Sequence, residues 1–147
     1  MRTIEHVLRT KGDTIFSTSP EATVFDALHM MAEYNVGALL VYSGEQLVGI
    51  VSERDYARKI VLKGRTSRET TVSEIMSSPL ITANVSMTVR ECLERMTSHH
   101  VRHMPVLREN EIVGIVSMGD LVSAIISEQE ILIQKLEKHI RERSKIF

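Results

Sequence analysis

The chain of 147 residues contains a single cysteine, no tryptophan, three tyrosines and three phenylalanines. One cysteine, Cys92, excludes an internal disulfide framework and is typical of a reducing compartment. The net charge of −1 gives no general attraction to nucleic acid or to a membrane surface. Apolar runs fall short of the roughly 20 residues that span a bilayer, and residues 1–6 lack the apolar core of a signal peptide. We therefore expect a soluble cytoplasmic protein without nucleic-acid or membrane partners.

One stretch of the sequence occurs twice. Residues 49–55 read GIVSERD, and residues 114–120 read GIVSMGD, at a spacing of 65. The spacing holds without a gap back to Thr23 and Thr88, and 12 of the 33 aligned positions are identical. Unrelated sequences would share about two. Two copies of one small unit imply a pseudo-twofold molecule with clefts where the copies meet.

Each copy is predicted to fold as strand, helix, strand, strand and helix. Segments whose apolar residues recur every 3.6 residues predict the helices, apolar segments rich in β-branched residues predict the strands, and turn residues separate them. A short apolar segment precedes each copy, since residues 4–8 resemble residues 72–76. The predicted class is α/β (α+β), with tandem β-α-β-β-α repeats packed as a pseudo-twofold pair and an extended C-terminal helix.

The repeat boundaries follow from this alignment. We expect repeat 1 at 3–63, a linker with the start of the second lead-in helix at 64–74, repeat 2 at 75–126, and a C-terminal amphipathic helix and tail at 127–147. The expected strands are 14–17, 38–41, 47–51, 79–82, 104–107 and 112–116, and the expected helices are 23–34, 54–64, 89–98 and 120–143. Thr23 with Asp26, and Thr88 with Glu91, have the spacing of a helix capping box.

The helix expected at 120–143 is longer than the duplicated unit requires. Its apolar stripe contains Ile125, Leu132, Leu136 and Ile140, and charged residues occupy the opposite face. An amphipathic helix that extends beyond its own domain usually buries its stripe on a partner subunit. We therefore expect a homodimer.

The duplicated stretch ends in Ser52-x-x-Asp55 and Ser117-x-x-Asp120, each after a strand and at the start of a helix. One interpretation is a helix cap, with Ser as the cap and Asp near the positive helix end. The other adds a ligand, because free amide groups bind phosphate and a carboxylate accepts from both hydroxyls of a ribose. The identical preceding glycine favours the ligand, since a cap does not require it and glycine permits close approach to the backbone.

This pattern, with the upstream segments 36–41 and 101–106, resembles the cystathionine β-synthase (CBS) domain. Such domains occur as tandem pairs, often called Bateman modules. The resemblance covers about residues 3–126. Residues 52–59 and the trailing helix are similar to stand-alone two-CBS proteins that act as signal-transduction or sensor proteins.

The resemblance implies two clefts that bind adenosine-containing regulatory ligands: AMP, ADP, ATP, NAD(H) or S-adenosylmethionine. Asp55 and Asp120 would hold ribose hydroxyls, and Ser52 and Ser117 would contact ribose or phosphate. Each cleft in such modules also takes contacts from the opposite repeat. Asp120 would therefore face Val36, Gly37 and Ala38, and Asp55 would face Val101, Arg102, His103 and Met104.

The two expected sites differ in charge. Arg54 and Arg58 place cations near the first motif, unless they lie on a solvated helix face, and the second copy supplies Arg102 and His103. Charge-assisted contacts are roughly twice as strong as neutral ones, so these residues would decide how many phosphates are bound. The function expected is a regulatory module that senses an adenine nucleotide and alters a dimer surface or an unidentified regulated protein.

Two alternatives remain at this point. His99, His100 and His103 could serve a nucleotide phosphohydrolase, but no nucleophile–base pair accompanies them. No Cys or carboxylate completes a zinc set beside them either, so no catalytic residue, metal site or required cofactor is predicted. The second alternative is a structural dimerisation unit in which both Ser-x-x-Asp motifs are only caps. Cys92 is expected to be a core residue rather than a nucleophile.

Overall fold

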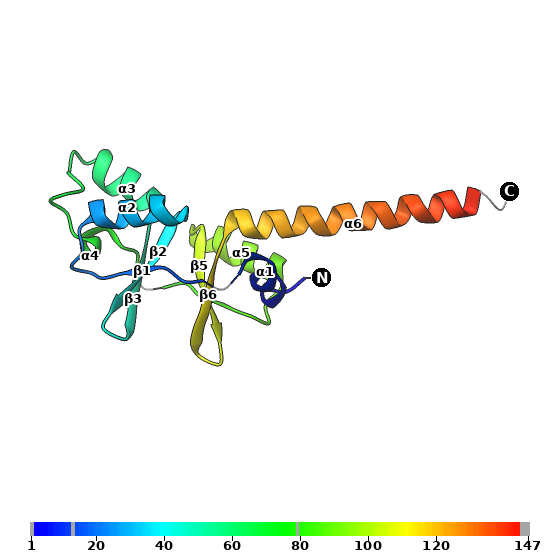
Figure 1. Ribbon diagram of the computed structural model, residues 1–147, viewed down its shortest axis with the longest axis horizontal. Helices are drawn as coiled ribbons and strands as arrows, with labels where there is room; N and C mark the ends of the chain where they lie inside the picture. The colour runs from blue at the N-terminus through cyan, green and yellow to red at the C-terminus, as the bar shows by residue number, and fades with distance from the viewer. Residues whose placement is uncertain (1, 13, 79, 145–147) are drawn as a thin grey trace. The chain divides into compact units, whose positions relative to one another are not determined.

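The computed structural model describes residues 2–12, 14–78 and 80–144 (Figure 1). The chain folds into two compact units. The first-repeat unit contains residues Thr14–Thr82, and the second-repeat unit combines Met1–Asp13 with Ala83–Phe147. Each unit contains one three-stranded sheet, in the order β1-β2-β3 or β4-β5-β6, with one parallel and one antiparallel pair. The predicted class, a tandem α/β repeat with a long C-terminal helix, is confirmed.

The first-repeat unit follows the predicted order of elements. Its sheet uses β1, β2 and β3, and its helical segments are α2, α3, the π-helical turn η1 and α4. The bounds are β1 Ser17–Thr18, α2 Val24–Tyr34, β2 Ala38–Ser43, β3 Gln46–Ser52, α3 Glu53–Tyr56, η1 Ala57–Val61 and α4 Val72–Ile75.

The second-repeat unit has the same plan, with a much longer last helix. The bounds are α1 Ile4–Lys11, β4 Ala83–Asn84, α5 Val89–His99, β5 His103–Arg108, β6 Glu111–Ser117 and α6 Met118–Ser144. The registers of the two sheets correspond, because Ala38 pairs with Ser52 in one unit and His103 with Ser117 in the other.

Each lead-in segment packs against the repeat that it does not precede. Before repeat 1, Thr3 bridges to Thr88, and the Ile4 amide donates to the Met87 carbonyl at 2.9 Å. Before repeat 2, Thr71 bridges to Thr23 of the first-repeat unit. The compact units in space therefore differ from the repeats along the chain.

The cores are built from the predicted apolar faces. In the first-repeat unit, Ala27 and Met31 of α2 are buried against Leu39 and Val41 of β2. In the second-repeat unit, the corresponding helix position is Cys92, which is completely buried as expected. Burial raises the pKa of its thiol to about 11, against a smaller opposing effect of Arg95. Cys92 is therefore a small core residue.

The first strand of each repeat begins later than predicted. The structure has strands at 17–18 and 83–84 rather than 14–17 and 79–82, and residue 79 lies outside the described residues. In repeat 1, Ser17 pairs with Leu40 and Thr18 with Val41, and the Leu40 amide also donates to the Phe16 carbonyl at 3.2 Å. The apolar run in 14–17 shows that the segment is extended, but the position of β2 decides which residues pair.

The second helix of repeat 1 is predicted from the sequence to run from 54 to 64. It is α-helical only to Tyr56, and a π-helical turn follows, in which the Leu62 amide donates to the Ala57 carbonyl at 3.3 Å. The apolar period does not distinguish this wider turn from an α-helix. Gly64 ends the segment with φ of 67°, the left-handed conformation that glycine adopts readily.

Helix starts follow the expected chemistry in part. The hydroxyl of Thr23 accepts from the Asp26 amide, and that of Thr88 from the Glu91 amide, both at 3.1 Å. These bonds are the hydroxyl half of a capping box.

Candidate ligand sites at the Ser-x-x-Asp motifs

Ser52 and Asp55 form a reciprocal capping box. Ser52 ends β3 and caps α3, and its hydroxyl accepts from the Asp55 amide at 3.2 Å. The Asp55 carboxylate accepts in return, through Oδ2, from the Ser52 amide at 3.0 Å and hydroxyl at 3.1 Å. The cap interpretation therefore describes the local structure of this motif correctly.

Ser117 and Asp120 have the same geometry in the other unit. The Ser117 amide donates to Asp120 Oδ2 at 2.8 Å, and the Asp120 amide donates to Ser117 Oγ at 3.1 Å. In both motifs the cap uses Oδ2, so Oδ1 of each carboxylate is not needed to hold the helix start. A cap and a ligand site are therefore compatible on the same two residues.

An ammonium group lies beside each of these carboxylates. Lys11 Nζ, at the end of α1, donates to Asp120 Oδ2 at 2.6 Å and to the Ile115 carbonyl at 2.8 Å. Lys59 Nζ lies 3.3 Å from Asp55 Oδ1 and donates to the Ile75 carbonyl at 2.8 Å. Each lysine thus links the motif with a neighbouring segment of its unit.

Neither lysine was among the predicted site residues. Lys11 lies outside the aligned part of the repeat, and Lys59 aligns with Ala124 at the spacing of 65. The two ammonium groups come from different elements, so no repeated residue pointed to them. For Lys59 alone, the i,i+4 spacing from Asp55 on a helix was a usable signal.

The second-repeat motif carries a perturbed acid. Burial raises the pKa of Asp120, but the hydrogen bonds from Lys11 and Ser117 and the charge of Lys11 lower it further. The net result is a pKa below the ordinary value of 3.8. Asp120 is therefore fully ionised at neutral pH.

The expected backbone segments lie beside the motif of their own repeat. The Glu53 amide donates to the Gly37 carbonyl at 3.1 Å, and the Met118 amide donates to the Arg102 carbonyl at 2.8 Å. Val36, Gly37 and Ala38 are thereby brought next to Ser52 and Asp55. The contacts expected across the repeats stay a prediction.

The segment at 101–104 has the same position in the second-repeat unit. Val101 and His103 are partly exposed, Arg102 is exposed, and Met104 is completely buried. A ligand could therefore reach the Arg102 side chain directly but Met104 only through its main chain. In the first-repeat unit Arg58 is exposed and Arg54 is half-buried.

The three histidines do not converge. His99 Nδ1 contacts the Arg95 carbonyl of its own helix at 3.0 Å, and His100 ends α5 with φ of 55°. His103 lies on β5. Among the described residues, no three His, Cys, Asp or Glu side chains are grouped as a metal site would require.

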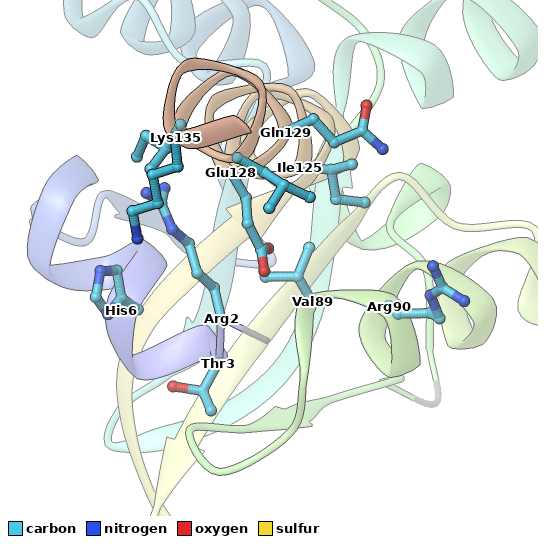
Figure 2. Close-up of a pocket in the computed structure, with 11 residues that line it drawn as sticks. Arg2, Thr3, His6, Val89, Arg90, Ile125, Glu128, Gln129 and Lys135 are labelled. Carbon is cyan, nitrogen blue, oxygen red and sulfur yellow. The ribbon is translucent and has the colours of Figure 1, made fainter. Parts of the chain in front are cut away.

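Two hollows lie along α1 and α6 of the second-repeat unit. A cavity of about 370 Å³ includes Asp120 and Lys11, with Arg2, His6, Val7, Thr10, Ser123, Ala124 and Ser127. A larger groove of about 820 Å³ is lined by Arg2, Thr3, His6, Val89, Arg90, Ile125, Glu128, Gln129, Ile131, Leu132 and Lys135. Figure 2 shows His6 and Lys135 on one side of this groove and Arg90 on the other.

The duplicated motif also matches a family model. The model of the CBS domain matches residues 5–62 and again residues 72–127. The chain belongs to the CBS-domain family. The resemblance inferred from the doubled Gly-Ile-Val-Ser-x-x-Asp pattern is therefore confirmed.

Relatives in plants and bacteria carry the same CBS pair. The chain is 38% identical over 148 residues to the CBS domain-containing protein CBSX3, mitochondrial, of Arabidopsis thaliana, covering 95% of this chain and 72% of that protein. A solved protein with CBS domains from Burkholderia ambifaria is 42% identical, with a TM-score of 0.82 over 86% of this chain and 96% of that one.

A more distant structure shares the fold of the CBS pair. The CBS pair of protein MJ0100, solved in complex with 5′-methylthioadenosine and S-adenosyl-L-methionine, is 21% identical, with a TM-score of 0.73 over 88% of this chain and 98% of that one. Among the described residues, no helix has the length and apolar character required to span a membrane.

The glycine that both CBS motifs share has a structural reason that the sequence did not reveal. A Cβ at Gly114 would lie 2.8 Å from Leu8 Cδ2, and one at Gly49 would lie 2.7 Å from Met76 Sδ. The lead-in segments occupy the space that a side chain would need. Close packing is thus a second reason for glycine at these positions, beside the close approach of a ligand, and the role of these glycines in ligand binding stays a prediction.

Proposed function

We propose that the protein is a regulatory CBS module that binds an adenosine-containing ligand at its two Ser-x-x-Asp motifs. The observation that carries this proposal is the repetition of one arrangement: a capped carboxylate, a neighbouring ammonium group and an adjacent backbone segment in each unit. A helix cap alone explains the serine and the aspartate of each motif. It does not explain why a lysine from a different element lies beside each aspartate.

The carboxylates are suited to a ribose. Asp55 and Asp120 each use Oδ2 for the cap, so Oδ1, which in Asp55 also lies 3.3 Å from Lys59 Nζ, would accept from the vicinal hydroxyls. Hydrogen bonds to a charged acceptor contribute about 1.5–3 kcal/mol each. The partly exposed backbone at Val36, Gly37 and Val101 would orient the adenine through main-chain hydrogen bonds.

The neighbouring charges favour a phosphorylated ligand. The cavity beside Asp120 is also lined by Lys11 and Arg2, so with His6 neutral its formal charge is positive. A phosphate would gain from this charge, whereas the sulfonium of S-adenosylmethionine would not. AMP, ADP, ATP or NAD(H) is therefore preferred over the two compounds bound by MJ0100, and Arg102 is a further phosphate contact.

Binding would act through a shift in population. A ligand that favours one packing of the two repeats changes the surface offered to a second copy or to a regulated protein. The module has no proposed catalytic residue. A cytoplasmic location, expected from the sequence, is part of the proposal and is tested by cell fractionation, since the Arabidopsis relative is named as mitochondrial.

Calorimetric titration of the full chain with AMP, ATP, NADH and S-adenosylmethionine tests the proposal. Asp55→Asn with Asp120→Asn keeps an acceptor for each cap but removes the charge, and we expect it to weaken nucleotide binding by about 10- to 100-fold per site. Asp26→Asn, an exposed acid in the first turn of α2, is the matched control. If none of the four compounds gives a binding heat, the proposal is refuted, and the motifs are only helix caps in a structural dimerisation unit.

A further inference from the structure

Helix α6 exposes an apolar face that its own unit does not cover. Leu121 is its one fully buried residue among those described, and from residue 129 onward every described side chain of the helix is exposed. In Figure 1 most of α6 extends away from the other elements of the second-repeat unit. The exposed large apolar residues are Val122, Ile126, Ile131, Leu132, Ile133, Leu136 and Ile140, which are 40–62% exposed.

Five of these seven residues follow a heptad pattern rather than the stripe expected from the sequence, and Ile131 and Leu132 lie outside it. Ile126, Ile133 and Ile140 recur every seven residues and occupy position a, and Val122 and Leu136 occupy position d. A repeat of apolar a and d residues is the seam of a coiled coil. Ile125, which belonged to the expected stripe, instead lines the groove between α6 and α1.

The charges of α6 differ between its two halves. Residues 122–133 contain Glu128 and Glu130 and no basic residue, for a charge of −2. Residues 134–144 contain four basic and two acidic residues, for a charge of +2. A second copy of the same helix therefore complements the first when it runs in the opposite direction, and repels it when it runs in parallel.

We propose that two copies of this chain pair through α6 as an antiparallel two-helix coiled coil. In the register that aligns every a position with a d position, Ile126 packs on the partner's Leu136, and Val122 packs on the partner's Ile140. Gln129 faces the partner's Ile133 and supplies the polar residue that fixes register in such seams. This inference goes beyond the proposed ligand function and does not depend on it.

The antiparallel arrangement has a signature at Glu130. Glu130 is at position e, and in this register it lies near Glu130 of the partner at the centre of the seam, where like charges oppose pairing. In a parallel pair it would instead flank Ile125. Glu130→Gln should therefore tighten an antiparallel dimer and leave a parallel one unchanged.

Sedimentation of the full chain over a range of concentrations measures the dimer. Ile133→Glu places charge in the seam and should weaken dimerisation by about 100-fold or more. Ile131→Glu, the same substitution on an exposed isoleucine away from the seam, should change it less than about threefold. Circular dichroism checks that both variants keep α6. A chain that stays monomeric at roughly 100 µM, or a dimer indifferent to Ile133→Glu, would overturn self-pairing and assign the face to another protein.

Cysteine cross-linking tests the direction. A mixture of Gln129→Cys and Ile133→Cys proteins should form the mixed disulfide, whereas Ile133→Cys alone should form little. The buried Cys92 stays unreactive in both. Rapid cross-linking of Ile133→Cys alone would show a parallel seam and would overturn the antiparallel arrangement.

Discussion

Replacing Lys11 by methionine isolates the role of the ammonium group beside Asp120. Methionine keeps the length and apolar stem of the side chain and removes its charge and donors. The substitution breaks the 2.6 Å contact to Asp120 Oδ2 and the 2.8 Å bond to the Ile115 carbonyl. Because Lys11 is at the end of α1, both contacts hold the lead-in helix to the second-repeat unit.

The expected loss of stability is modest. A partly exposed ion pair contributes up to about 1 kcal/mol, and the hydrogen bond to the carbonyl about 1 kcal/mol. We expect Lys11→Met to lower the free energy of unfolding by about 1–2 kcal/mol at pH 7, which lowers Tm by about 3–8 °C in a chain of this size. Lys63→Met, on an exposed loop, is the matched control and should leave Tm unchanged.

The loss should depend on pH in one direction. The pKa of folded Asp120 lies below the ordinary 3.8, so its ionised form stabilises the fold above that value and the contribution disappears as pH falls through the lowered pKa. The difference between wild type and Lys11→Met should therefore be largest near neutral pH and shrink below about pH 4. Urea unfolding at a series of pH values measures it.

The same variant tests the ligand class. Without Lys11, a ribose no longer competes with an ammonium group for Asp120, but a phosphate loses a cation. We expect the preference for AMP over adenosine to fall by about tenfold, measured by titration of both compounds. An unchanged preference, together with unchanged stability across pH, would refute the role assigned to Lys11.

Three further predictions concern packing. Gly114→Ala should destabilise the fold by about 1–3 kcal/mol through its clash with Leu8, and Leu8→Ala in the same chain should make the Gly114 substitution nearly neutral, measured by a double-mutant cycle of urea unfolding. His100→Gly should stabilise by about 0.5–1 kcal/mol in thermal unfolding, because His100 has φ of 55°. Iodoacetamide should label Cys92 only when the protein unfolds, since the thiol is buried and its pKa is about 11. Mass spectrometry that shows labelling of the folded protein at the rate of an exposed thiol would contradict this burial.

The sequence predicted those elements whose own residues carry the signal. The strands expected at 38–41 and 47–51 lie within β2 and β3, and the helix expected at 120–143 lies within α6. Apolar periods and the turn around Gly44 were sufficient for these. Each Ser-x-x-Asp motif was also placed correctly at the junction of a strand and a helix, because the same pattern occurs twice.

Features that depend on contacts between distant segments could not be predicted in this way. The short strand β1 is set by its pairing with β2, and Lys11 meets Asp120 only because α1 packs on the second-repeat unit. The packing of each motif's glycine against Leu8 or Met76 could not be predicted either, because these neighbours are distant in the sequence. The local sequence pattern was therefore sufficient to identify Asp55 and Asp120, whereas the residues around them are determined by tertiary packing.

The exchange of lead-in segments makes the two halves of the chain inseparable in practice. Ile4, Val7 and Leu8 belong to the core of a unit whose other residues begin at Ala83. A truncation that removes the first dozen residues would leave repeat 1 intact and unfold the distal repeat instead. A protease cut near Gly12, or a bulky tag fused ahead of Ile4, would likewise disturb the structure around Asp120 before it disturbs the structure around Asp55.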